Sequence, residues 1–273
     1  MNRTTQNTNF WRNVIQAAAL TLIAGTLGFA QSNASNIPTG VRNSRTRGLN
    51  ANQLQMIEQT LRQKTGFTEL GFDAQGGLTL GDRNRVAGGS ATARALVTAA
   101  VESGNLYELE SHENAPDVAF AQINETEDKV IGETGQRLTV FQVHLDFADF
   151  DRVSGAREAK ASFDVGIALL HELVHGVLRL QDPQGGMDEI GACDAHVNQM
   201  RRELHLPERL YYHPNITVIQ TRMGRFVCAS LEFTEGNAQA DAKYRLNWRA
   251  DHVSPAARNI AQLQQGLVTA KRR

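Results

Sequence analysis

The sequence predicts an α+β fold, in which helices pack on a mixed or antiparallel sheet within one domain. Several segments place apolar residues three and four positions apart, which is the spacing of an amphipathic helix. Other segments carry strand-forming residues between polar turns that contain glycine, as the strands of a sheet do. The chain has 273 residues, of which 41% are hydrophobic, so it is long enough to bury a sizeable core.

Residues 1–30 have the order of features found in a secretory signal peptide. Arg3 and Arg12 are the charges of this segment, residues 14–30 are mostly apolar or small, and the segment ends in a small-x-small cleavage site. An uncleaved anchor is the alternative, but the apolar part is short for the roughly 20 residues that a membrane span requires. We therefore expect an exported protein, secreted or periplasmic, with no stable membrane anchor after cleavage.

Residues 31–50 are rich in Asn, Ser, Thr, Gly and Arg, and this composition predicts a flexible linker. Residues 51–273 then form the single predicted domain. Its first two helices are expected at 51–64 and 90–103, because apolar residues repeat there at helical spacing.

Three strands are expected next, at residues 106–110, 118–123 and 138–147. Along the third strand large apolar residues alternate with polar ones, so one side should pack in the core and the other should face water. His144 and Asp146 lie on the polar side and are expected to be solvated.

Residues 162–181 contain the sequence His171-Glu172-Leu173-Val174-His175 within a long apolar run. Apolar residues surround nearly every side of the predicted helix, so it should be buried. His171 and His175 project from one face, where two imidazoles can bind the same ion, and Glu172 lies at the edge of that face. Burying these polar groups costs several kcal/mol unless they find partners, and a metal ion satisfies all three. The alternative is a pair of hydrogen-bonded core histidines with a salt-bridged Glu172.

This helix resembles the active-site helix of the zincin metallopeptidases, in which the two His bind zinc and the Glu is the general base. The resemblance covers residues 162–181. It implies a zincin-like domain with zinc as cofactor, in which His171 and His175 are metal ligands and Glu172 takes a proton from metal-activated water. It also implies that a strand preceding the helix borders the cleft and pairs with extended substrate.

A catalytic zinc needs a third protein ligand and an open position for water. One branch of the zincins takes a His six residues after the second His, but Gln181 stands there. The gluzincin branch takes a Glu from a later helix, and the next helix is predicted at 187–204 after a turn with Pro and two Gly. Glu189, near the start of that helix, is the expected third ligand, with Asp194 and His196 as alternatives.

Two strands, at 216–221 and 225–233, and a helix at 255–267 complete the predicted domain. Cys193 and Cys228 are the two cysteines, and an exported protein meets an oxidising compartment, so they are candidates for a disulfide. Four residues are candidates for stabilising an oxyanion: Tyr211, Tyr212, His213 and His252.

The sequence thus predicts an exported zinc metallopeptidase that hydrolyses peptide bonds in a protein or peptide substrate. A net charge of −1 and the lack of a basic stripe with interleaved aromatic residues argue against nucleic acid as a partner. Two alternatives from other classes are a zincin-like binding or structural module without turnover and a metal-free exported interaction domain.

Overall fold

The computed structural model describes residues 38–131, 136–185, 189–222, 224–235 and 243–253. All of these residues belong to one compact unit, Ile37–Arg273. The predicted signal peptide and the helix predicted at 255–267 lie outside the described residues. Within these ranges, no helix combines the length and apolar character needed to span a membrane.

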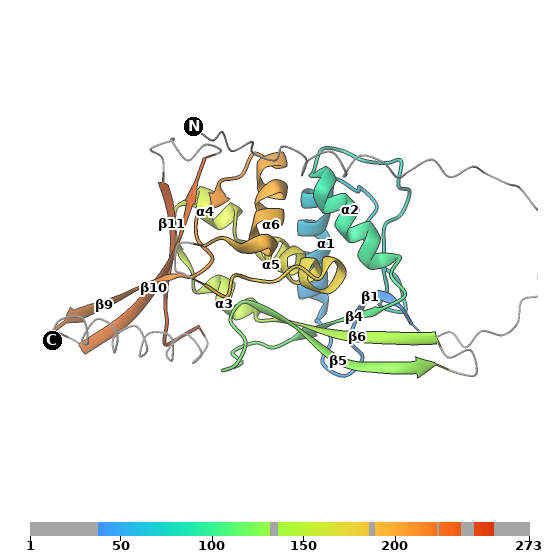
Figure 1. Ribbon diagram of the computed structural model, residues 1–273, viewed down its shortest axis with the longest axis horizontal. Coiled ribbons are helices and arrows are strands. Elements are labelled where there is room, and N and C mark those ends of the chain that lie inside the picture. Colours follow the sequence, from blue (N-terminus) through green and yellow to red (C-terminus); the bar gives the residue numbers. More distant parts are fainter. Residues whose placement is uncertain (1–37, 132–135, 186–188, 223, 236–242, 254–273) are drawn as a thin grey trace, which may run out of the picture. The chain divides into compact units, whose positions relative to one another are not determined.

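Helices of the protein pack on a four-stranded mixed sheet (Figure 1). Its order is β1 (Gly40–Asn43), β4 (Leu106–Ser111), β6 (Gln136–Leu145) and β5 (Ala121–Ile131). Strands β1, β4 and β6 are parallel to one another, whereas β5 runs antiparallel to β6. Strand β5 therefore lies at an edge of the sheet.

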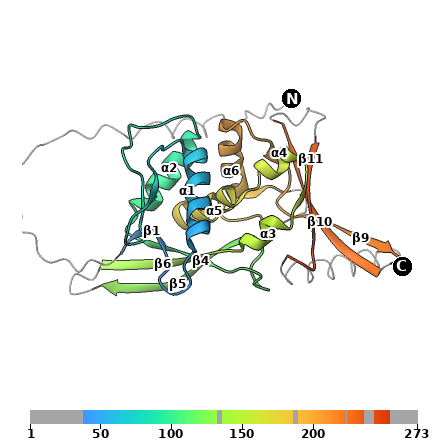
Figure 2. The same cartoon turned by 180° about the vertical axis from the view of Figure 1, so that it is seen from behind.

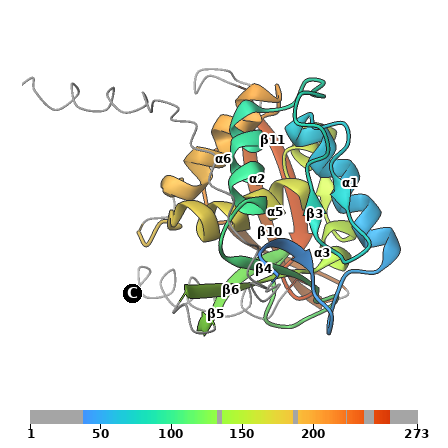
Figure 3. The same ribbon diagram turned by 90° about the vertical axis from the view of Figure 1, so that its right-hand side faces the viewer.

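Helices cover one face of this sheet, as the end-on view of Figure 3 shows. They are α1 (Ala51–Thr65), α2 (Ala91–Val101), α5 (Val165–Leu173) and α6 (Gly191–Glu203). The apolar face of each predicted helix points into a common core with the strands, which explains why sequence periodicity located them. This core includes Ile57, Leu61, Leu96, Val97, Leu109, Val143, Leu145, Leu169, Leu170, Leu173, Val197 and Met200.

A second, antiparallel sheet has its own core (Figure 2). Its strands are β7 (Ser154–Gly155), β11 (Lys243–Arg249), β10 (Gly224–Thr234) and β8 (Glu208–Arg209), and β9 (Asn215–Thr221) also pairs with β10. The short helix α3 (Phe147–Asp151) connects β6 to β7, and the short helix α4 (Arg157–Ala161) follows β7. A separate pair of short strands is formed by β2 (Gly71–Phe72) and β3 (Leu78–Thr79).

The α+β class is confirmed, while three local predictions need correction. Part of the predicted linker is strand β1, because Val41 and Leu49 are buried in the core. Strand β5 starts later than predicted, since Phe120 has a φ of 64° that does not fit a strand. Asp146 is fully buried and not solvated, because it caps α3 by accepting a hydrogen bond from the Asp149 amide.

Candidate metal centre

Helix α5 carries the first histidine, and a π-helical turn carries the second. Asp164 caps α5 by accepting a hydrogen bond from the Ile167 amide. After Leu173 the backbone continues as the π-helix η1 (Val174–Leu178), which ends at Arg179 in the left-handed conformation with a φ of 57°. Such π turns inside helices are frequent at functional sites. The helix predicted at 162–181 is present, but it is shorter and changes its winding at the second histidine.

Gly176 allows this turn to approach the sheet. A Cβ atom at this position would lie 2.6 Å from Tyr107 Cε1 on β4 and 2.9 Å from Ile123 Cδ1 on β5. Both distances are shorter than carbon atoms tolerate, so a larger residue would push the turn away from the strands. The glycine thus sets the separation between His175 and the edge strand.

The two imidazoles converge on one point through their Nε2 atoms. His171 Nε2 and His175 Nε2 are 3.2 Å apart, and the rings are nearly perpendicular. His175 Nδ1 lies 2.6 Å from the Leu180 carbonyl oxygen. Because a carbonyl only accepts, the proton of a neutral His175 sits on Nδ1, which leaves the Nε2 lone pair free for a metal.

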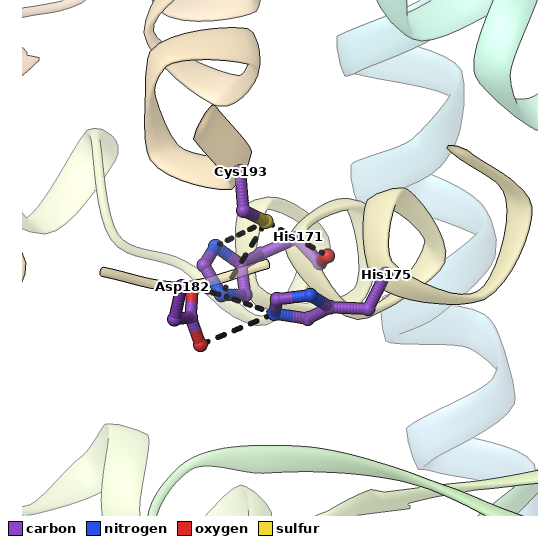
Figure 4. Close-up of side chains that lie close together, drawn as sticks. All are labelled: His171, His175, Asp182 and Cys193. Atoms are coloured by element: carbon purple, nitrogen blue, oxygen red, sulfur yellow. Dashed lines mark hydrogen bonds and ion pairs between the residues drawn. The ribbon is translucent and has the colours of Figure 1, made fainter. Parts of the chain in front are cut away.

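Asp182 completes this group from the segment after the π turn (Figure 4). Its Oδ1 lies 3.3 Å from His171 Nε2, and its Oδ2 lies 3.2 Å from His175 Nε2. The Tyr212 hydroxyl donates to Oδ2 at 2.6 Å and so holds the carboxylate in place. Burial raises the pKa of Asp182, but hydrogen bonding to the two histidines outweighs this effect and lowers it far below its ordinary value.

These distances are close to those around a zinc ion. Ligand atoms 2.0–2.1 Å from a tetrahedral zinc ion lie roughly 3.3–3.4 Å from one another. The two Nε2 atoms are 3.2 Å apart, and each lies 3.2 or 3.3 Å from a different oxygen of Asp182. Asp182 Oδ1 is buried and faces His171 Nε2 at 3.3 Å. Burial lowers the pKa of His175, but Asp182 and the Leu180 carbonyl outweigh burial and raise it to about 9. The group therefore attracts positive charge, and a divalent ion would supply it.

Glu172 lies beside this group as a second, separate carboxylate. It is buried, with 8% of its surface exposed, and burial raises its pKa even though both histidines act to lower it. Glu172, His171, His175 and Asp182 line a cavity of about 370 Å³. A carboxylate with a raised pKa on the wall of such a cavity is suited to accept and release a proton.

The edge strand β5 forms the other wall of this cavity. The lining residues from this strand are Ala121, Gln122, Ile123 and Glu125. The resemblance led us to expect that the strand predicted at 138–147 borders the cleft. Instead β5 supplies four lining residues, and β6 contributes Phe141. His144, on the neighbouring strand β6, does not line the cavity.

A second, more apolar cavity of about 320 Å³ adjoins the first, and it shares His171, Glu172 and Tyr212 as lining residues. Its apolar wall contains Phe120, Phe163 and Trp248, whose rings meet edge to face at centroid distances of 4.9 and 5.2 Å from Phe120. Of the candidate oxyanion donors, Tyr212 lines both cavities and His213 lines the apolar one.

Cys193 approaches the histidine pair from α6. Its Sγ lies 3.5 Å from His171 Nδ1 and 3.7 Å from His171 Nε2, and it donates weakly to the His171 carbonyl at 3.6 Å. Burial raises the pKa of the thiol well above its ordinary value. Cys193 and Cys228 are both free, so the suggested disulfide is wrong: Cys193 packs on His171 beside α5, whereas Cys228 lies on β10 of the second sheet.

Asp194, an alternative third ligand, is committed to other partners. It is fully buried, and its carboxylate pairs with Arg201 at 3.3 Å and with Arg209 at 3.0 Å. Its closest approach to the site is 3.8 Å, between Oδ1 and His171 Nδ1. This carboxylate therefore faces the back of the His171 ring, where it favours a proton on Nδ1 and a lone pair on Nε2.

The structure does not bring Glu189 or His196 into the histidine group. Glu189 is exposed ahead of α6, where its backbone carbonyl accepts a hydrogen bond from the Tyr212 amide and its carboxylate lies next to Gly185. Glu189 is therefore not part of this group of potential ligands. Asp182 takes the place that the sequence led us to expect for Glu189, because the chain folds back directly after the π turn.

Sequence reasoning missed Asp182. This residue follows Gln181 directly in the chain, and the π turn with the left-handed Arg179 that precedes it is not visible in the sequence.

Comparison with protein-family models, with curated proteins and with solved structures gives no match to this chain.

Proposed function

We propose that this protein is an exported, zinc-dependent peptidase of the zincin type. One observation carries the proposal: the Nε2 atoms of His171 and His175 and the carboxylate of Asp182 lie within 3.2–3.3 Å of one another, next to the buried carboxylate of Glu172 and on the wall of an open cavity. Three protein ligands leave the fourth position of a tetrahedral ion for water or substrate, which distinguishes catalytic from structural zinc sites.

In the proposed reaction, Glu172 accepts a proton from the attacking water and passes it to the leaving amine. A bound zinc ion would supply Lewis acidity, which polarises the scissile carbonyl and lowers the pKa of the water. His175 is held in the ligating tautomer by the Leu180 carbonyl. Tyr212 orients Asp182 through its hydroxyl, so it is a positioning residue in this scheme.

The substrate would lie along β5 as an extended peptide. Among the described strands, β5 pairs with β6 alone, so its other edge is open to an added strand. The neighbouring apolar cavity, with Phe163 and Trp248 in its wall, has the size and character to take a large apolar side chain. We therefore expect cleavage next to such a residue.

A closed structural zinc site is the second candidate, because Cys193 belongs to the same group of potential ligands. A fourth protein ligand would fill the position that catalysis needs. Two features favour the open site. The Cys193 thiol is nearly equidistant from both ring nitrogens of His171, so it lies against the ring. Its raised pKa also disfavours the thiolate that binds metals.

Zinc content and peptide cleavage, measured on the full-length or secreted protein and on two variants, test this proposal. Elemental analysis should find zinc, and cleavage of a peptide library should depend on it. Glu172→Gln should keep the zinc and lower kcat about 10²- to 10⁴-fold, since it removes the base and no ligand. Cys193→Ser should keep both zinc and activity. Loss of zinc in Cys193→Ser together with no turnover in the parent protein would instead establish the closed structural site.

A further inference from the structure

A second group of potential metal ligands lies on the sheet, separate from the histidine helix. Glu110 is on β4, His112 follows that strand, and His144 is on β6. Glu110 and His144 are directly opposite in the strand register, so they share a face of the sheet, and His112 follows Glu110 by two residues. Val143 and Leu145 point to the other face, into the helix-covered core. The two groups therefore belong to opposite faces of the sheet.

The ligand atoms of these three residues converge. Glu110 Oε2 lies 3.1 Å from His112 Nε2 and 3.7 Å from His144 Nε2. The two imidazoles stack with a centroid distance of 3.8 Å and an interplanar angle of 15°. Both Nε2 atoms thus point toward the same carboxylate oxygen, although the two rings must tilt apart to share one ion.

The carboxylate is held in position by a neighbouring strand. Glu110 is 3% exposed, and its Oε1 accepts a hydrogen bond of 3.1 Å from the Ser44 hydroxyl, just after β1. This contact leaves Oε2 for the histidines, as an outer contact orients a metal-binding carboxylate. The His112 and His144 side chains are 12% and 13% exposed, so the group is largely enclosed but reachable from solvent.

His144 Nε2 is buried and has no hydrogen-bond partner among the described residues. An imidazole nitrogen without a partner costs free energy in a buried place, and an ion between the three ligand atoms would remove that cost. Two charged side chains act on His144 in opposite directions. Asp117 favours a positive charge at this histidine, and Arg47 disfavours it.

We propose that Glu110, His112 and His144 form a second binding site for a divalent first-row transition metal. Two imidazoles and one carboxylate are a ligand set that suits zinc and its neighbours, whereas calcium and magnesium prefer oxygen ligands alone. A bound ion would join β4 to β6 and would fix residues 112–120, which lead into β5. The site would therefore stabilise the strand that borders the catalytic cavity, independently of the proposed peptidase activity.

The test isolates this site by removing the first one. His171→Ala/His175→Ala, stripped of metal and then equilibrated with zinc or cobalt, should still bind about one equivalent by elemental analysis. Cobalt should give visible absorption bands typical of nitrogen and oxygen ligands. Adding Glu110→Gln should abolish that equivalent, and zinc should raise the melting temperature of the double variant but not that of the triple variant.

Glu108→Gln is the matched control, since it removes a carboxylate two residues earlier on the same strand without touching the group. It should keep the metal. If Glu110→Gln impairs folding, His112→Gln replaces it, because His112 lies beyond the end of β4. A double variant that binds no metal would overturn the proposal and leave a hydrogen-bonded histidine pair, and metal retained by both the Glu110→Gln and His112→Gln variants would overturn it as well.

Discussion

The two groups of potential ligands use similar side chains but sit in different surroundings. His171, His175 and Asp182 open onto a cavity with a substrate-sized volume, and Glu172 stands beside them without being needed as a ligand. In the second group, the carboxylate of Glu110 is itself one of the potential ligands, together with His112 and His144. These residues line neither of the two cavities described above. The comparison teaches that the ligand set alone does not indicate catalysis. The first group differs from the second in two ways: it has a proton acceptor, Glu172, that is not a ligand, and it adjoins a cavity with space for substrate.

The origin of the two groups differs as well. The histidine helix brings its ligands together through local geometry, because residues four apart share a face of a helix. The group of Glu110, His112 and His144 depends on the parallel register of β4 and β6. This register places His144 opposite Glu110, which is 34 positions earlier in the chain. The histidine pair of the first group can be found by a sequence motif, whereas Asp182 and the whole of the second group are found only in a structure.

The largest effect is expected at Asp182, which decides whether the first group holds its metal as proposed. Asp182→Ala removes one of three ligands and should weaken zinc binding by at least about 10- to 100-fold, with loss of activity. Glu189→Ala is the matched control, since its carboxylate lies next to Gly185, and it should keep both. Equilibrium zinc titration with a competing chelator measures the difference. The reverse result would restore Glu189 as the third ligand and remove Asp182.

The next prediction concerns the surroundings of the two groups, because the first group adjoins the apolar cavity, whereas the second lines neither of the two cavities described above. Trp248→Ala should enlarge that cavity and raise KM for substrates with a large apolar side chain by about 10-fold, while substrates with a small residue change little. Trp248 is 7% exposed, so Trp248→Phe serves as the control for folding. An equal change for all substrates would show that this wall does not select side chains.

Sequence reasoning predicted the α+β class, the helices of the core and the pair of histidines because each depends on local periodicity. It failed where a side chain is positioned by a distant segment. Asp182 depends on a π turn and on the Tyr212 hydroxyl, and Asp194 is drawn into the core by Arg201 and Arg209. Asp146 looked solvated on strand alternation, but the strand ends before it and a helix begins. Such contacts are set by the tertiary fold.

The smallest effect is expected at Glu203, which lies outside both groups and contributes to the stability of the fold that carries them. Glu203, at the end of α6, accepts hydrogen bonds from the Ser90 hydroxyl at 2.6 Å and from the Thr92 amide at 2.9 Å, so it ties α6 to the start of α2. Burial raises the pKa of Glu203, but these contacts and the Gln199 side chain outweigh burial and lower it to about 2, from an ordinary 4.5.

A carboxyl group whose pKa is lower in the folded state stabilises the fold above its unfolded pKa and loses that contribution as the pH falls through the folded value. The contribution of Glu203 is therefore complete above pH 4.5 and is lost between about pH 4.5 and 2. Glu203→Gln should lower the free energy of unfolding at pH 7 by about 1 kcal/mol, because exposure to solvent weakens these hydrogen bonds. Urea unfolding at pH 7 and pH 3 measures it. Glu208→Gln, which breaks a surface ion pair with Arg202, is the control and should cost less. An equal loss for Glu203→Gln at both pH values would contradict the assignment, since the charged form would then contribute nothing beyond the shape of the side chain.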